Sequence, residues 1–245
     1  MRIGFFGDSF VMEESNPHSW YHNYDTYIRK LKKHYNADIV NLGIGGSSYW
    51  DLMLKQFPPF LDNLPDVTIF CWTDSSRIYD PEVRNINMWT ASTNLIKDFQ
   101  LNKLLKYKKY KAAKDFFEHL HDHDKADREM VSALYYFDRE VLAPIQEKTK
   151  IIHLWSFGKG IDWERKNVYT PDNVKYLYRW QTGVELRPSL KCFSPIGTLT
   201  DNDNLSANHL GSEENNSLVF NLIKNAIDDH SNNLCVTEQI NYNAK

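Results

Sequence analysis

The feature that most constrains the fold is an alternation of short apolar runs with segments of helical periodicity. Runs at Met1–Phe6, Asp38–Leu42 and Asp66–Trp72 have the length and content of buried strands. Between them, residues 24–35 and 49–57 carry apolar side chains at helical spacing. This order is typical of βαβ units, so we expect parallel strands with helices on both faces of the sheet.

The second half of the chain continues the pattern with a long interruption. Lys150–Trp155 is the next expected strand, and Asn215–Ile227 has the apolar stripe of a closing helix. The stretch before this strand is longer than one crossover connection requires. We therefore expect a helical insertion at about residues 89–125 and the crossover helix at 126–148. No element is predicted for residues 158–200.

Composition and charge exclude several classes of protein. The chain has 245 residues, 42% of them hydrophobic, which suits one domain over residues 1–230 and a loose tail at 231–245. A net charge of −3 provides no general attraction to nucleic acid or to an anionic membrane. Three widely spaced cysteines form neither a disulfide framework nor a metal pair, which favours a reducing compartment. With no signal peptide or membrane span evident, we expect a cytoplasmic protein.

Polar and glycine-rich segments follow the expected strands. Gly7–Phe10 follows the first, Gly43–Ser48 the second and Thr73–Arg77 the third, while Asn208–Leu210 precedes the last helix. In an open parallel sheet, ligands bind beyond the carboxyl ends of the strands. A serine on a tight turn, a glycine-rich loop and a histidine are the parts that acyl transfer needs: nucleophile, oxyanion donors and base.

Three of these segments resemble sequence blocks of the SGNH hydrolases, a family of GDSL-like lipases and esterases. Gly7–Phe10 is similar to the Gly-Asp-Ser block, Asn41–Ser48 to the block Asn-x-Gly-x-x-Gly-x-Ser/Thr, and His209 to the last block. Their order and spacing match over most of the chain. The resemblance implies a three-layer α/β/α sandwich with a mainly parallel, flavodoxin-like sheet.

The resemblance also implies roles for individual residues. Ser9 would be the nucleophile, His209 the base that takes its proton, and the backbone N–H groups of Ser9 and Gly46 the oxyanion hole. Glycine suits the latter position because the backbone must approach the substrate closely. The implied activity is hydrolysis of a small acyl ester through an acyl-serine intermediate, with an O-acetylated carbohydrate as the favoured substrate and no metal or cofactor.

The chain departs from the family pattern at two positions. The family's third block, Gly-x-Asn-Asp, contributes an Asn donor, whereas here Asp74 and Ser75 follow Thr73. A charged Asp74 would repel an oxyanion unless protonated, so Ser75 or Thr73 is the alternative donor. The last block, Asp-x-x-His, has no acid at its first position here, and Asp203, Asp201 or a backbone carbonyl would orient the histidine.

Two other readings of the same residues stay open. The altered blocks fit a repurposed binding or structural module on the same fold. The loop Gly43–Gly46 fits a phosphate or nucleotide site, although it matches neither common glycine-rich phosphate motif.

A histidine-rich segment, His119–Asp124, also contains candidate metal ligands. If these histidines lie on one helix, side chains two residues apart point about 200° away from each other. We therefore expect a solvated helix end at this segment and no metal site.

Overall fold

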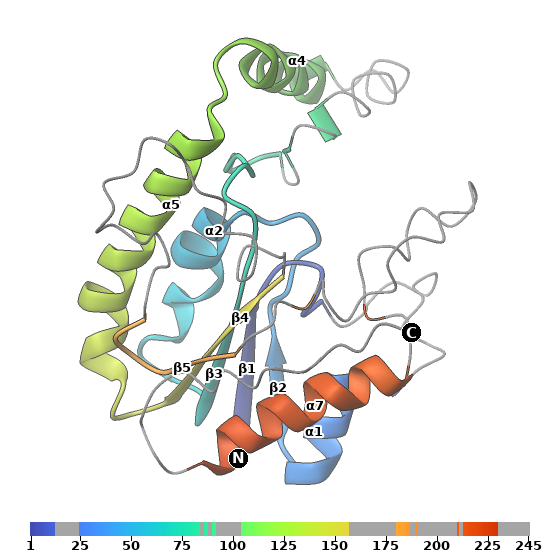
Figure 1. The fold of residues 1–245 in the computed structure, drawn as a ribbon, viewed down its shortest axis with the longest axis vertical. Coiled ribbons are helices and arrows are strands. Elements are labelled where there is room, and N and C mark those ends of the chain that lie inside the picture. Colours follow the sequence, from blue (N-terminus) through green and yellow to red (C-terminus); the bar gives the residue numbers. More distant parts are fainter. Residues whose placement is uncertain are drawn as a thin grey trace.

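One parallel sheet forms the centre of the molecule (Figure 1). The computed structural model describes residues 1–12, 25–83, 86–87, 90–91, 104–156, 180–186, 190, 210 and 213–229. The strands within these residues are β1 (Arg2–Gly7), β2 (Asp38–Asn41), β3 (Val67–Trp72), β4 (Lys150–Trp155) and β5 (Val184–Glu185).

The strand order is β2-β1-β3-β4-β5, and every neighbouring pair is parallel. This is the flavodoxin-like order of a doubly wound α/β fold, so the predicted fold class is confirmed. The first four strands lie where the apolar runs predicted them. β5 was not predicted, because a two-residue strand is too short to show any periodicity; it is defined by pairing with Ile152 and His153.

Helices cover both faces of the sheet (Figure 1). They are α1 (Tyr27–Tyr35), α2 (Tyr49–Asp51), α4 (Leu104–His119), α5 (His123–Tyr136) and α7 (Glu213–Asp228). α2 continues as a π-helical segment, Leu52–Gln56, and α5 continues as another, Phe137–Leu142. Short 3₁₀ turns follow at Pro58–Phe60 and Ala143–Ile145. α5 begins earlier than expected because the Asp122 side chain caps it by accepting from the N–H of Lys125.

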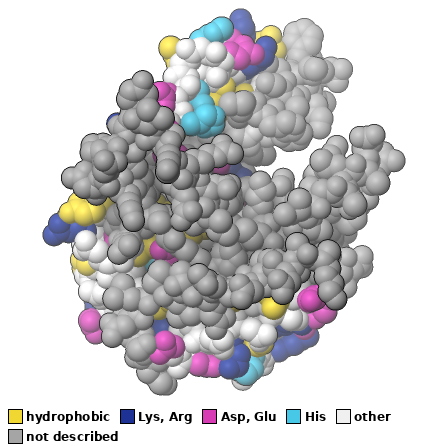
Figure 2. Space-filling model, in the orientation of Figure 1, with side chains coloured by type: hydrophobic (Ala, Val, Ile, Leu, Met, Phe, Trp, Pro, Cys, Tyr) yellow, Lys and Arg dark blue, Asp and Glu magenta, His cyan; other side chains and the backbone are white. Residues whose placement is uncertain are grey.

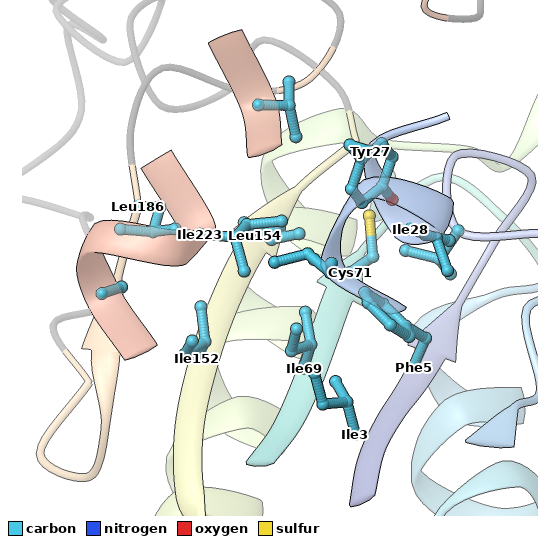
Figure 3. Packing of buried hydrophobic residues seen from close by; sticks show 14 of the residues in the cluster. Ile3, Phe5, Tyr27, Ile28, Ile69, Cys71, Ile152, Leu154, Leu186 and Ile223 are labelled. Atoms are coloured by element: carbon cyan, nitrogen blue, oxygen red, sulfur yellow. The ribbon is translucent and has the colours of Figure 1, made fainter. Parts of the chain in front are cut away.

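Alternate strand residues build a separate core on each face of the sheet. One core packs the strands against α1 and α7, and Figure 3 shows its side chains converging from these elements. Its strand members include Ile3, Phe5, Ile69, Cys71, Ile152 and Leu154. The other core packs the intervening strand residues against α2, α5 and the π-helical segments; its strand members are Phe6, Phe70, Trp72 and Ile151. The sheet is therefore buried on both sides, as near-continuous apolar strands require.

α4 lies away from the sheet and has a small core of its own (Figure 1). Tyr110 and Phe117 pack there against Val83 and Ile86. On the surface seen in Figure 2, acidic and basic side chains of the described residues are interspersed. None of the helices in the described ranges is long and apolar enough to cross a bilayer.

The second core contains a fully buried histidine, His153 of β4. Its ring stacks on Trp180 with 3.6 Å between centroids and an interplanar angle of 6°. Trp72 Nε1 donates to His153 Nδ1 (3.0 Å), and His153 Nε2 lies 3.0 Å from the carbonyl oxygen of Thr182. Because Nδ1 accepts, Nε2 carries the hydrogen and the ring is neutral. Burial lowers the pKa of His153 to about 3.

We expect this histidine to make the fold acid-sensitive. The pKa rises from about 3 in the folded protein to about 6.5 on unfolding, so the unfolded chain binds more protons between these values. The free energy of unfolding should fall as pH drops through this window, by up to about 1.4 kcal/mol per pH unit from this residue. Urea unfolding at pH 6.5 and 4.5 should show a smaller fall in His153→Gln than in the wild type. The exposed His119→Gln is the control, and equal pH dependence in all three proteins would contradict the prediction.

Candidate functional site

A tight turn directly after β1 carries Ser9. The N–H of Val11 donates to the carbonyl oxygen of Asp8 (3.2 Å), and the N–H of Phe10 donates to the Asp8 carboxylate (3.0 Å). These two bonds close the turn, and Met12, directly after it, is not helical. Phe10 and Val11 are buried, whereas Ser9 is only half-buried. The turn thus holds Ser9 at the carboxyl edge of the sheet, where ligands bind in this class of fold.

The Asp8 carboxylate is fully buried beneath this turn and joins four segments of the chain. Oδ1 accepts from the Ser156 hydroxyl at 2.7 Å, and Oδ2 lies 3.3 Å from Nη1 of Arg77. The Arg77 side chain is 9% exposed and donates to the carbonyl oxygen of Ser47 at 3.0 Å. A buried carboxylate needs such a partner, since an unpaired charge in the interior is costly. Asp8 is therefore part of the framework that supports the turn.

A buried thiol lies against the same network. Cys71 Sγ is 3.1 Å from the Ser156 hydroxyl oxygen. Burial, followed by the negative charge of Asp8, raises the pKa of Cys71 well above its usual value. The thiol stays protonated at neutral pH and is a poor nucleophile, which leaves Ser9 as the better candidate at this edge.

The Gln56 side chain forms hydrogen bonds with both backbone groups of Gly7, the last residue of β1. The N–H of Gly7 donates to Gln56 Oε1 (2.7 Å), and Gln56 Nε2 donates back to the carbonyl oxygen of Gly7 (3.0 Å). The Ser47 hydroxyl donates to that same carbonyl at 2.9 Å. Both Gln56 and Ser47 are buried. These bonds fix both the N–H and the carbonyl group of Gly7, from which the Ser9 turn starts. The Ser47 hydroxyl is directed into the protein interior.

The glycine-rich loop after β2 packs directly on the chain that follows Ser9. Asn41 Nδ2 donates to the carbonyl oxygen of Val11 (2.6 Å), and Asn41 Oδ1 accepts from the N–H of Gly43 (2.9 Å). A Cβ at Gly43 would lie only 2.6 Å from the backbone nitrogen of Met12. Glycine is required here because two backbone segments meet. The structure therefore brings the predicted nucleophile turn and the predicted oxyanion loop together.

The tip of this loop is a β-turn whose form depends on Gly46. The N–H of Ser47 donates to the carbonyl oxygen of Ile44 at 3.0 Å. Gly46, the third residue of the turn, has a φ of 75°, and Gly45 is not among the described residues with positive φ. Positive φ at the third position alone defines a type II turn. Compared with a type I turn, the peptide between Gly45 and Gly46 is flipped, which sets the direction of the Gly46 N–H.

The contacts of this loop do not favour the phosphate-binding alternative. The N–H groups of Gly43, Ile44 and Ser47 are used within the site framework. The N–H of Ser48 donates to the Asp51 carboxylate at 3.0 Å, and Ser48 with Asp51 forms a capping box. A phosphate cradle needs several free N–H groups and no nearby carboxylate. Here most of the backbone N–H groups already have partners, and the buried carboxylate of Asp51 lies at the start of α2.

Thr73, Asp74 and Ser75 follow β3 at the position where the resembled family has its third block. Asp74 Oδ1 accepts from both the backbone N–H (2.7 Å) and the hydroxyl (2.6 Å) of Ser76. The Ser75 hydroxyl donates to the Asp127 carboxylate of α5. Thr73 is buried. The prediction that Asp74 or Ser75 contributes to substrate binding is not tested by these contacts and stays a prediction.

The predicted base and its candidate acids, His209, Asp203 and Asp201, lie outside the described residues. Leu210, the residue after His209, is buried in the core beside α7. Asn216 Nδ2 donates to the carbonyl oxygen of Leu210 at 3.0 Å.

This contact belongs to a chain of hydrogen bonds that ends next to Ser9. Asn216 Oδ1 accepts from the backbone N–H of Tyr27 at 3.0 Å. The Tyr27 hydroxyl donates to the carbonyl oxygen of Phe10 at 2.8 Å. Asn216 and Tyr27 therefore link Leu210, which follows His209 in sequence, to Phe10, which follows Ser9.

The sequence analysis did not identify Gln56, Arg77 or Ser156 as parts of the site. Gln56 had a signal, because it occupies the apolar stripe of residues 49, 52, 53 and 56. Ser156 directly follows β4 and so lies at the same sheet edge as the other segments. Arg77 lies in the segment Thr73–Arg77 that was expected after β3, but its pairing with Asp8 leaves no signal in the sequence, since the two residues are distant along the chain.

The histidine-rich segment does not lie on one helix, contrary to the geometry assumed from its spacing. α4 ends at His119 and α5 begins at His123. His121 lies between them, with its Nε2 3.2 Å from His123 Nδ1. In the described part of the chain, no group of three or more His, Cys, Asp or Glu side chains is placed to hold a metal ion.

Comparison with known proteins does not assign this chain to a family. No protein-family model matches the sequence, and no curated protein matches it. The structure is similar to a candidate GDSL-like lipase from Parabacteroides merdae, with 16% sequence identity and a TM-score of 0.33. The match covers 64% of this chain and 60% of that protein. A likeness this distant carries no conclusion about activity.

We expect the type II turn to make the two adjacent glycines respond differently to substitution. Gly46→Ala places a Cβ at a left-handed φ and should destabilise the fold by about 1–2 kcal/mol. Gly45→Ala is the matched control, because its Cβ meets only Met12 Sδ at an ordinary 3.6 Å. Both changes restrict the unfolded chain equally. Urea unfolding measures the difference, and equal stabilities would contradict the turn assignment.

Proposed function

We propose that this chain is a serine ester hydrolase that acts on small acyl esters. The observation that carries the proposal is the position of Ser9, half-buried on a closed turn at the carboxyl edge of the sheet and beside the loop of Gly46. A nucleophile at the end of a buried strand, next to a turn that directs a backbone N–H, is the arrangement that acyl transfer needs. The resemblance of the sequence blocks supports the same reaction.

In the proposed mechanism, His209 removes the hydroxyl proton of Ser9 as its oxygen attacks the acyl carbon. The carbonyl π bond opens, and the resulting oxyanion accepts from the N–H groups of Ser9 and Gly46. The protonated His209 then gives its proton to the leaving alcohol oxygen, and the acyl group stays on Ser9. Water, deprotonated by His209, attacks this ester and releases the acid while Ser9 regains its proton.

The buried network around Asp8 keeps the Ser9 turn and the loop of Gly46 in fixed relative positions. Asp8 is adjacent to Ser9, and its ion pair with Arg77 ties the turn to Ser47, which is adjacent to Gly46. Preorganised donors contribute to catalysis because they need no reorganisation during the reaction. The substrate class within this proposal is an O-acetylated carbohydrate, on the basis of the family resemblance.

The nucleophile is tested with a fluorophosphonate and intact mass. One label should appear on the wild type, and Ser9→Ala should remove both the label and aryl-acetate hydrolysis. Ser132→Ala, which changes an exposed serine on α5, is the control and should label normally. A label that survives in Ser9→Ala, or that maps to Ser47, overturns the assignment. Saturable sugar binding without turnover would support the binding-module alternative.

The base is tested by substitution at and near the last block. His209→Ala should lower both the labelling rate and kcat steeply, because the Ser9 hydroxyl then has no base. If Asp203 or Asp201 orients the histidine, changing that residue to Asn should lower kcat by up to about 10⁴-fold. If a backbone carbonyl does so, both Asn variants should stay near wild type. Unchanged activity in His209→Ala would contradict the mechanism.

A further inference from the structure

The segment after β3 lacks the Asn that donates to the oxyanion in the resembled family. Of the three residues directly after β3, Asp74 and Ser75 have hydrogen-bond partners in the protein. The Asp74 carboxylate accepts from Ser76, and it has no hydrogen to donate when ionised. The Ser75 hydroxyl has a single hydrogen, and it points to the Asp127 carboxylate. Both side chains thus already have hydrogen-bond partners within the described part of the chain.

The third residue, Thr73, has a hydroxyl that no group in the described part of the chain satisfies. The residue is 4% exposed, and its Oγ1 is buried without a hydrogen-bond partner among the residues that the structure describes. Buried polar groups in native proteins are nearly always hydrogen-bonded, so an exception calls for an explanation. One explanation is that the hydroxyl donates its hydrogen to an acceptor atom on a bound ligand.

The register of the sheet places Thr73 at the same edge as Ser9. Gly7 of β1 pairs with Cys71 of the adjacent parallel strand β3. Ser9 lies two residues after Gly7, and Thr73 lies two residues after Cys71. Both residues thus leave neighbouring strands at the same level, at the carboxyl edge of the sheet.

We propose that the Thr73 hydroxyl is the third donor to the oxyanion, in the place of the missing Asn. This inference rests on the proposed hydrolase function. The hydroxyl donates its hydrogen to the former carbonyl oxygen when Ser9 attacks, together with the N–H groups of Ser9 and Gly46. Because the negative charge develops only in the transition state, Thr73 stabilises that state more than the bound substrate.

The test is Thr73→Val, which keeps the shape of the side chain and removes the hydroxyl. The rate of fluorophosphonate labelling of Ser9 and kcat for an aryl acetate should both fall about 100-fold, with little change in KM, as for loss of one oxyanion donor. Tm should stay the same or rise, because an unsatisfied buried hydroxyl is replaced by a methyl group. Thr73→Ser keeps the donor and should recover most of the rate.

Thr68→Val is the matched control on β3, the strand that leads to Thr73. It removes a buried hydroxyl that already has a partner, the Thr149 hydroxyl at 2.8 Å, near the start of β3, so it should lower Tm and leave the labelling rate near that of the wild type. A slow Ser75→Ala together with a normal Thr73→Val overturns the inference in favour of Ser75.

The outcomes separate this inference from the function on which it rests. Ser9-dependent labelling at an unchanged rate in Thr73→Val overturns the role of Thr73 and leaves the hydrolase proposal intact. A lower Tm in Thr73→Val with a normal rate also overturns it, since the hydroxyl would then be structural. Failure of the wild type to label at Ser9 overturns the proposed function and this inference together.

Discussion

The rest of the site depends on the buried carboxylate of Asp8. It lies directly after β1 and receives a hydroxyl from the end of β4, a guanidinium from the loop after β3, and a backbone N–H from its own turn. Through Arg77 it also reaches the loop after β2. The carboxylate can be fully buried only while all of these partners are in place. The ends of four strands are thereby held in one arrangement.

This constraint gives the residues around Ser9 two separate tasks. Gln56, Ser47 and Asn41 satisfy backbone groups that the turn and the loop would otherwise bury unpaired. Ser9 and Gly46 are left at the surface of this framework, one half-buried on its turn and the other fixed in a left-handed conformation. Within each short segment, some residues thus stabilise the fold, and adjacent residues are available for the proposed chemistry.

Most of the sheet and the segments at its edge could be predicted from sequence. Four strands and α1 matched their apolar patterns, because burial on both faces of a parallel sheet leaves a strong signal in each strand. β5 was not predicted, and the break between α4 and α5 lies a few residues before the boundary expected at 125/126. Two paired residues have no periodicity, and the polar residues around the Asp122 cap give little indication of where one helix ends and the next begins.

The sequence by itself determined which chemical groups stand after each strand, since strand ends and glycine-rich turns depend on neighbouring residues. It therefore pointed to Ser9 and to the loop of Gly46 without knowledge of any contact. Only the tertiary structure decided how these groups are used. Examples are the pairing of Asp8 with Arg77, the hydrogen bond from Ser75 to Asp127, and the Thr73 hydroxyl, which is buried without a partner among the described residues. Such relations arise from packing in three dimensions, and no local pattern encodes them.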